Sequence, residues 1–346
     1  MTWINYDDVV DQLAASGLML DGGIDVNTAR PVRVRVEGGD REKRGWYWLT
    51  DFDLPDANGV LQRYIGGAFG VYHGNDNGKQ AVKIKRDGAP ALTAAEKGAI
   101  RQRQEALTKR AKAIRIAEAK RAADQADRAW RKYVPTGRSD YLERKGVGAH
   151  GLRFSPSGNG TLAVPMLRNG RIVGLQIIRG KDRGNKLEKQ YWPAGMDKIG
   201  AYHQIGGAPR DVVLVCEGYA TGASLFEATG IPTLVAFDAG SLMPVVAGLR
   251  KQHARLKILT CAHDDYLTPN NPRVEAARLA ATAHDAAWLS PEFAEERPTT
   301  KKGATDFNDL HAQEGLHVVR EQVMARIAAL GWQLAPARGA PPQGEG

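Results

Sequence analysis

Cysteine is scarce in this chain of 346 residues, which has only Cys216 and Cys261. Two thiols are too few for a disulfide framework or for a four-thiolate zinc site, so we expect no zinc. We expect both cysteines to be small buried hydrophobic side chains in the reducing cytoplasm.

Long apolar runs are also lacking. No stretch approaches the roughly 20 apolar residues of a membrane-spanning helix, so we expect no integral membrane protein. Residues 1–8 show neither a basic segment nor an apolar run, so we expect no secretory signal. A loop of the form Gly-x-x-x-x-Gly-Lys-Ser/Thr is missing, so any helicase that acts with this chain would be a separate protein.

Acidic residues are outnumbered, with 39 Asp and Glu against 48 Lys and Arg, which gives a net charge of +9. This balance favours an anionic partner such as nucleic acid. The excess is concentrated in residues 97–132, which hold twelve basic and four acidic residues, no proline and one glycine. The composition predicts a long basic helix within residues 91–133, and Thr93 with Glu96 has the spacing of a capping box at its start.

Two interpretations of this basic helix stay open. It is either a solvated connector between folded parts, or it contacts the phosphates of nucleic acid through side chains such as Arg110, Lys112 and Arg115.

Residues 1–90 predict a small β-rich module that follows one helix. Helical spacing over residues 7–20 precedes short alternating runs at 31–36 and 46–49. Seven of the chain's aromatic residues lie between Trp46 and Tyr72, among or just after the basic residues Arg30, Arg33, Arg35, Arg41, Lys43, Arg44 and Arg63. This mixture suits single-stranded nucleic acid, so Arg44, Trp46 and Trp48 are candidate binding residues. The alternative is that the rings fill the core of a small domain.

Residues 134–208 predict a second β-rich part. Pro135 and Gly137 mark a boundary after the basic helix, and a short helix is expected at 139–146. Alternating runs at 161–166 and 171–178, joined by Asn169 and Gly170, predict a β-hairpin.

Residues 209–330 predict a parallel α/β unit, because apolar strands alternate with helices. The strands are expected at 212–216, 233–237 and 256–262, and the helices at 220–229, 242–250 and 272–288. The proline-rich residues 333–346 predict a disordered tail.

Carboxylates gather where the strands of this unit end. Glu217 follows the first strand, the run His263-Asp264-Asp265 follows the third, and the run from Asp306 to Asp309 lies in a later loop. Chemistry in parallel α/β sheets sits at these ends, and carboxylates without matching basic partners usually hold a hard divalent cation. A helix cap is the simpler explanation for any single Asp, but three clusters at one edge favour metal-dependent phosphoryl or phosphodiester chemistry.

The segments 217–222, 236–242, 261–265, 271–272 and 306–310 resemble the motifs of Toprim domains, with a spacing similar to that of primases from conjugative plasmids and phages. Upstream, residues 141–147, 164–165, 174–178 and 189–193 resemble the basic half of bacterial-type primase cores. Residues 8–73 resemble the N-terminal module of plasmid primases. The resemblance implies an α/β fold, α+β overall: a Toprim parallel α/β domain at 209–330, preceded by a β-rich primase-core subdomain, a long basic helix and a small β-rich N-terminal module.

The same resemblance implies a DNA primase, which joins nucleoside triphosphates into short primers on a single-stranded DNA template during replication of a mobile element. It assigns general acid/base and metal-facing roles to Glu217. It also assigns His263 and Asp265 to the metal pair, and Asp306 and Asn308 to the third acidic motif. Lys189 and Lys198 match residues that face the nucleotide triphosphate or primer, with catalysis resting on Glu217, Asp265 and Lys189. For Lys181 and Lys186 we favour a surface role.

One departure from the family concerns His263, which stands where the family has Asp. Imidazole is a poor ligand for Mg²⁺, the expected cofactor, but a good one for Mn²⁺. Three outcomes stay open: Asp264 substitutes for the missing carboxylate, the enzyme prefers Mn²⁺, or the metal site is degraded.

Three other functions also stay open. They are a Toprim nuclease, a single-stranded DNA-binding protein derived from a primase, and a generic phosphate-binding α/β protein. A zinc ribbon for template recognition is missing from the sequence, so the aromatic and basic N-terminal module would take that role.

The two interpretations of the basic helix differ in a measurable way. Replacing Arg110, Lys112 and Arg115 together by Ala should flatten the dependence of single-stranded DNA binding on salt by roughly 0.7 in log–log slope for each phosphate that the helix no longer neutralises. Fluorescence anisotropy over a salt series measures this slope, and an unchanged slope would make the helix a connector.

Overall fold

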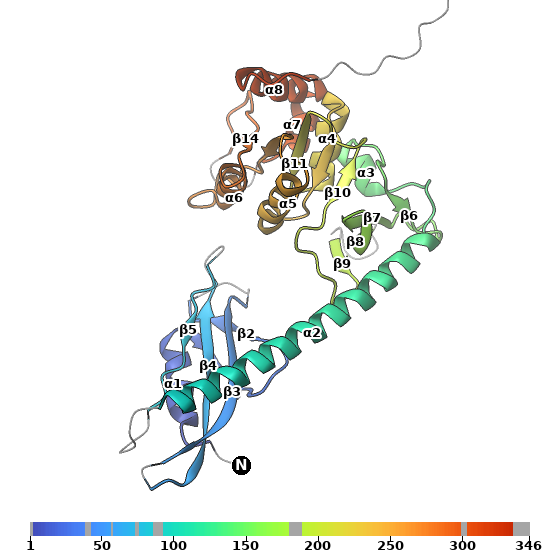
Figure 1. Ribbon diagram of the computed structural model, residues 1–346. Coiled ribbons are helices and arrows are strands. Elements are labelled where there is room, and N and C mark those ends of the chain that lie inside the picture. Colours follow the sequence, from blue (N-terminus) through green and yellow to red (C-terminus); the bar gives the residue numbers. More distant parts are fainter. Residues whose placement is uncertain are drawn as a thin grey trace, which may run out of the picture. The chain divides into compact units, whose positions relative to one another are not determined.

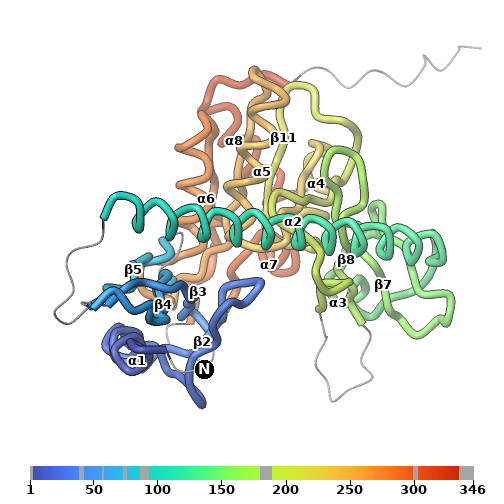
Figure 2. Tube along the Cα trace, turned by 60° about the horizontal axis from the view of Figure 1, so that its bottom comes forward, coloured from blue at the N-terminus to red at the C-terminus, as the bar shows by residue number. Residues whose placement is uncertain are grey.

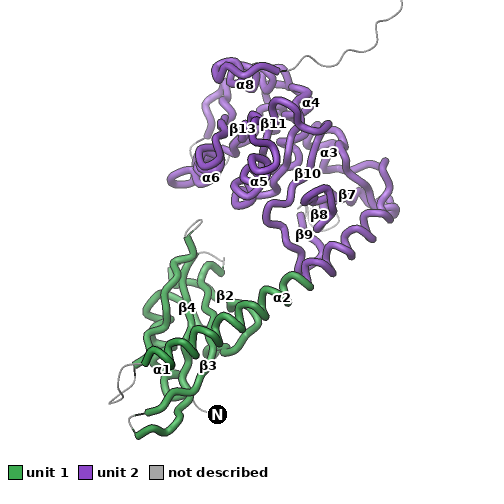
Figure 3. The backbone as a smooth tube through the Cα atoms, viewed as in Figure 1, with its two compact units in different colours: residues 1–117 green, residues 118–346 purple. Residues whose placement is uncertain are grey.

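The computed structural model of the chain describes residues 3–38, 43–56, 58–72, 76–85, 93–179, 189–298 and 303–334. It divides into two compact units, Met1–Ala117 and Glu118–Gly346, which we call the N-terminal and the C-terminal unit (Figure 3). The predicted tail beyond residue 334, together with Arg41, Lys181 and Lys186, lies outside the described residues. Within the described ranges, no helix is both long enough and apolar enough to cross a membrane.

The N-terminal unit is built on a five-stranded antiparallel sheet in the order β1-β2-β3-β4-β5. Helix α1 (Tyr6–Ala15) packs Val9 and Leu13 against Tyr47 and Ile65 on one face of this sheet. The strands are β1 (Leu18–Met19), β2 (Val32–Val36), β3 (Gly45–Pro55), β4 (Leu61–Val71) and β5 (Gln80–Ala81).

The aromatic rings of this unit are mostly core. Five of the seven are buried: Trp46, Tyr47, Phe52, Tyr64 and Phe69. Trp48 is partly exposed and Tyr72 is 36% exposed. Burial of these large rings supplies the apolar surface that a unit of this size needs for a core. The alternative that the rings fill the core of a small domain therefore holds for most of them.

Helix α2 (Ala94–Lys132) is one continuous helix that begins in the N-terminal unit and ends in the C-terminal unit (Figure 2). The predicted capping box is confirmed, since the Thr93 amide donates to Glu96 and the Glu96 amide donates to Thr93 Oγ1. In the N-terminal unit Ile100 packs with Phe52 and Tyr64, and Arg103 pairs with Asp51 at 3.0 Å.

The C-terminal unit starts with a four-stranded antiparallel sheet, β6-β7-β8-β9. The predicted hairpin is confirmed: β7 and β8 pair, and Asn169 and Gly170 between them have φ of 50° and 73°. Ala126 and Trp130 of α2 cover one face of this sheet at Leu175 and Ile177. The elements are α3 (Asp140–Lys145), β6 (Arg153–Phe154), β7 (Leu162–Arg168), β8 (Arg171–Ile178) and β9 (Lys189–Trp192).

The other sheet of this unit is the expected parallel α/β sheet, in the order β10-β12-β11-β13-β14, with β10 antiparallel at one edge. One face packs on α4, α7 and α8 and the other on α5 and α6 (Figure 1). The strands are β10 (His203–Ile205), β11 (Val212–Cys216), β12 (Thr233–Val235), β13 (Lys257–Cys261) and β14 (Ala287–Leu289). The helices are α4 (Tyr219–Thr229), α5 (Ala239–Gln252), α6 (Pro272–Thr282), α7 (Phe307–Glu314) and α8 (Leu316–Ala329).

Two predicted helices are too long. Helical spacing is expected over residues 7–20, but α1 ends at Ala15 and Leu18–Met19 forms β1. The sequence predicts a helix over the whole run 272–288, but α6 ends at Thr282 and Ala287 already belongs to β14. The cause is tertiary: Asp285 turns the chain with φ of 49°, and β14 then pairs with β13 in parallel. The fold class is α/β as predicted, both cysteines are buried and free, and the borders of the five predicted segments stay predictions.

Ala126 offers a test of how tightly α2 packs in the C-terminal unit, because its side chain has no exposed surface. Ala126→Leu adds volume to a filled site and should lower the free energy of unfolding by about 1–3 kcal/mol. Ala113→Leu, at an exposed position of the same helix, should change it little. Urea denaturation followed by circular dichroism measures both, and equal stability of the two variants would contradict the packing.

Candidate active site

The parallel sheet brings two chain segments together at the carboxyl ends of its strands. The chain leaves β11 toward β12 on one side, while β13 pairs with β11 on the other side. Loops on the two sides of such a switch point diverge and leave a crevice, which is where open α/β sheets bind ligands. Glu217 directly follows β11, and the run His263–Asp265 follows β13 by one residue. These side chains therefore follow the two strands, β11 and β13, that meet at the switch point.

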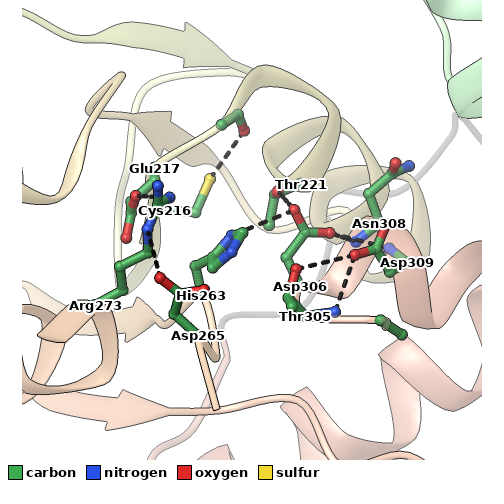
Figure 4. A network of polar contacts seen from close by, with 12 residues as sticks. Cys216, Glu217, Thr221, His263, Asp265, Arg273, Thr305, Asp306, Asn308 and Asp309 are labelled. Atoms are coloured by element: carbon green, nitrogen blue, oxygen red, sulfur yellow. Dashed lines mark hydrogen bonds and ion pairs between the residues drawn. The ribbon is translucent and has the colours of Figure 1, made fainter. Parts of the chain in front are cut away.

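Arg273, at the start of α6, joins two of the carboxylates (Figure 4). Its Nη1 lies 3.0 Å from Glu217 Oε2 and its Nε lies 3.8 Å from Asp265 Oδ2. The guanidinium thus holds a carboxylate from β11 and one from the loop after β13 at the same cation.

Glu217 is the most deeply placed of these carboxylates, with 8% of its side chain exposed. Burial raises the pKa of Glu217 to about 7, although the charge of Arg273 opposes the shift. Its Oε1 atom is buried and has no hydrogen-bond partner among the described residues. A buried carboxylate oxygen of this kind is costly to leave unpaired, so it marks a position for a ligand.

His263 lies between this carboxylate pair and Asp306 (Figure 4). The His263 Nδ1 atom is 3.7 Å from Asp306 Oδ2, which also accepts a hydrogen bond of 3.0 Å from Thr221. The other oxygen of Asp306 accepts the amides of Asn308 and Asp309 and so caps α7. The simpler explanation of Asp306 as a helix cap therefore holds for one of its two oxygens.

The six metal ligands predicted from the sequence are not assembled. Asp264 has other partners, because its carboxylate accepts from Asn271 at 2.5 Å and pairs with Arg297 at 2.7 Å. The amide nitrogen of Asn308 donates to Lys145 O and Ser224 Oγ, which makes this residue a packing group. Among the residues that the structure describes, no three His, Cys, Asp or Glu side chains form a metal-binding group.

The premise that the carboxylates lack basic partners is also wrong, because Arg273 and Arg297 pair with them. Glu217 and Asp265 are the two predicted ligands that Arg273 joins. The full set of six ligands stays a prediction. The Glu217 oxygen that has no partner in the described part of the chain fits Mg²⁺, which usually takes one or two protein carboxylates and fills its other positions with water and phosphate.

Lys189 and Lys198 come from the antiparallel sheet and the turn that follows it. The Lys189 ammonium lies 5.1 Å from the centre of the Tyr141 ring. Although much of the residue is exposed, desolvation of the ammonium lowers the pKa of Lys189, and the charge of Asp306 opposes this shift. Lys198 donates to Asp238, the residue that caps α5 after β12. The structure therefore directs both lysines toward the carboxylate end of the parallel sheet.

The predicted nucleic-acid-binding residues belong to the N-terminal unit. Arg110, Lys112 and Arg115 are exposed on α2, whereas Arg44 and Trp48 are partly exposed and Trp46 is buried. Their contact with nucleic acid stays a prediction.

Sequence reasoning missed Arg273, although the sequence carries a sign of it. Pro272 marks the start of a helix, and a basic residue directly after that start faces the positive end of the helix dipole. A cation in this unfavourable position indicates a carboxylate partner elsewhere in the fold.

Comparison with known proteins bears on these arrangements. No protein-family model matches the chain. It is similar to two proteins from Escherichia coli that are both named DNA primase TraC. One is 30% identical over 163 residues, which are 44% of this chain and 11% of the relative. The other is 26% identical over 334 residues, which are 90% of this chain and 29% of the relative.

The chain thus spans less than a third of the length of these curated relatives. Among solved structures it is similar to the DnaG primase catalytic domain bound to ssDNA, with a TM-score of 0.41 and 13% identity over 62% of this chain and 80% of that one. The sequence matches make the chain similar to DNA primases, and both relatives described above carry the name TraC.

Arg273 and a divalent cation would compete for the same carboxylates. Arg273→Ala should therefore tighten the binding of Mn²⁺ by about tenfold, because a charge attraction to Glu217 and Asp265 no longer has to be displaced. Arg278→Ala is the matched control, since this arginine of α6 pairs with Glu275 at the surface. Calorimetric titration of the full chain measures both affinities, and unchanged or weaker binding to Arg273→Ala would contradict the competition.

Proposed function

We propose that this chain is a DNA primase core that joins nucleotides on single-stranded DNA, in the replication of a plasmid or a related mobile element. One observation carries the proposal: at the carboxyl end of a parallel sheet Glu217 and Asp265 share Arg273, and a buried Glu217 oxygen has no partner among the described residues. The similarity to plasmid-type primases supports the same assignment. We further propose that residues 209–330 are a Toprim domain and that residues 134–208 are a primase-core subdomain.

Glu217 and Asp265 would hold the divalent cation of this reaction. Such a cation neutralises phosphate charge and acts as a Lewis acid on phosphoryl oxygens. Mg²⁺ suits two carboxylates, and His263, at the edge of this pair, is the feature that would favour Mn²⁺.

The chain's own residues account for the remaining needs of nucleotidyl transfer. The 3′-hydroxyl of one nucleotide attacks the α-phosphorus of a second, the bond to the leaving pyrophosphate breaks, and Glu217 takes the hydroxyl proton. Lys189 and Lys198 supply positive charge for the triphosphate and the primer, and Arg273 binds phosphate once it leaves the carboxylates. The template is single-stranded DNA.

Glu217→Ala tests the assignment. The variant should lose at least a hundredfold in primer synthesis from labelled nucleoside triphosphates, because it removes both a cation ligand and the proton acceptor (about 10² or more for such groups). Binding of single-stranded DNA should persist. Glu275→Ala, which removes a partly exposed carboxylate of α6, should keep full activity.

The same assay, run with Mg²⁺ and with Mn²⁺, separates the other functions. Primer synthesis by Glu217→Ala at the wild-type level would contradict the site. Shortening of the template without synthesis would mean a nuclease. Tight DNA binding without either activity would mean a protein that keeps only the binding function.

A further inference from the structure

The N-terminal unit contains a cavity of about 770 Å³ between the β3–β4 face of its sheet and residues 97–108 of α2. All of the residues that line it belong to this one unit. Its volume is within the range of about 300–1,000 Å³ that is usual for small-molecule sites. The side chains that line it differ in size in a regular way between β3 and β4.

The cavity exists because large residues on β3 face small residues on β4. In the antiparallel register Trp46 is opposite Gly70, Trp48 is opposite Ala68, and Thr50 is opposite Gly66. Directly opposed residues share a face of the sheet, so the β4 side of this face carries almost no side-chain volume. Helix α2 closes over the space and leaves it unfilled.

Hydrogen bonds from their N–H groups fix two indole rings that line this cavity. Trp46 Nε1 donates to Asn77 O at 2.8 Å, and Trp48 Nε1 donates to Thr28 O at 2.9 Å. With the N–H groups bound to the backbone, it is the apolar ring surfaces that line the cavity. Fixed aromatic faces stack bases of any sequence at little entropic cost.

The charge of the lining is one-sided. Lys79, Lys97 and Arg101 line the cavity, and none of its described lining residues is acidic. Tyr72, also in the lining, lies 6.4 Å from the Trp46 ring and has the Arg33 guanidinium 4.4 Å from its own ring centre. Arg101 also lies 4.0 Å from Glu105 of the same helix. An apolar peptide would offer these cations no anion, whereas a nucleotide offers a flat base to the rings and a phosphate to the cations.

We propose that this cavity holds one unpaired base of single-stranded nucleic acid, stacked on Trp48, with Lys97 and Arg101 at the adjoining phosphates. The choice of a nucleic-acid strand as occupant rests on the proposed function, because a primase reads a single-stranded template. The cavity itself lies in a different unit from Glu217 and needs no catalysis to bind.

The test compares two labelled DNA strands of equal length and charge, one of mixed sequence and one with abasic sites throughout. Wild-type full-length chain should bind the intact strand about fivefold or more tightly than the abasic strand, as measured by fluorescence anisotropy. Trp48→Ala should remove most of this difference. Trp3→Ala, which removes a partly exposed tryptophan of the same unit outside the cavity, should preserve it.

Three more variants separate stacking from folding and from charge. Ala68→Leu fills the cavity floor without removing a ring or a charge, and should also abolish the difference between the strands. Trp48→Phe keeps an aromatic face and should retain most of it. Lys97→Ala should weaken the binding of both strands by a similar factor, because both strands carry phosphates.

Equal binding of the two strands by wild type would overturn the proposal. So would a Trp48→Ala variant whose affinity falls equally for both strands. If Trp48→Ala does not fold, as judged by its thermal unfolding, then Ala68→Leu and Trp48→Phe decide the question. Glu217→Ala should keep the full difference between strands. A variant that loses primer synthesis but keeps the difference between the strands has a defect in the active site and not in the cavity. The two proposals can therefore be contradicted independently.

Discussion

Carboxylates at the carboxyl edge of the parallel sheet repel one another, and the elements around the sheet offset that repulsion with cations. Each of four acidic side chains pairs with a basic one from another part of the chain: Glu217 with Arg273, Asp238 with Lys198, Asp264 with Arg297, and Asp309 with Lys145. The partly exposed pairs contribute little individually. Glu217 and Asp264 differ because both residues are buried, so loss of Arg273 or Arg297 would leave a buried carboxyl group without its basic partner.

This pairing has a consequence for the proposed reaction. Arg273 satisfies the carboxylates in the absence of other cations, so a divalent ion has to displace it from Glu217 and Asp265. A triphosphate would draw the guanidinium away by offering it a better-matched anion. Binding of the ion and of the nucleotide would then reinforce each other, because each removes the competitor of the other.

Local patterns in the sequence were sufficient for much of the fold and for the position of Glu217. The apolar run before it predicts β11, the Asn169–Gly170 pair predicts the hairpin, and Thr93 with Glu96 predicts the start of α2. What could not be predicted depends on partners that are distant in the chain. Arg273 is 56 residues from Glu217, and Asp264 turns toward Arg297 instead of the other carboxylates. Strand β4 was missed because its glycines hide the alternation, although the same glycines open the cavity beside Trp48.

The two cysteines give this sheet an internal reporter. Cys216 ends β11 and Cys261 ends β13, the neighbouring strands that lead to Glu217 and to His263. Both thiols are buried, at 0% and 1% exposure, and burial raises the pKa of each, so neither reacts while the sheet is closed. The sequence contains no other thiol. The rate at which a thiol reagent modifies the chain therefore reports how often the strands that carry the candidate active site open.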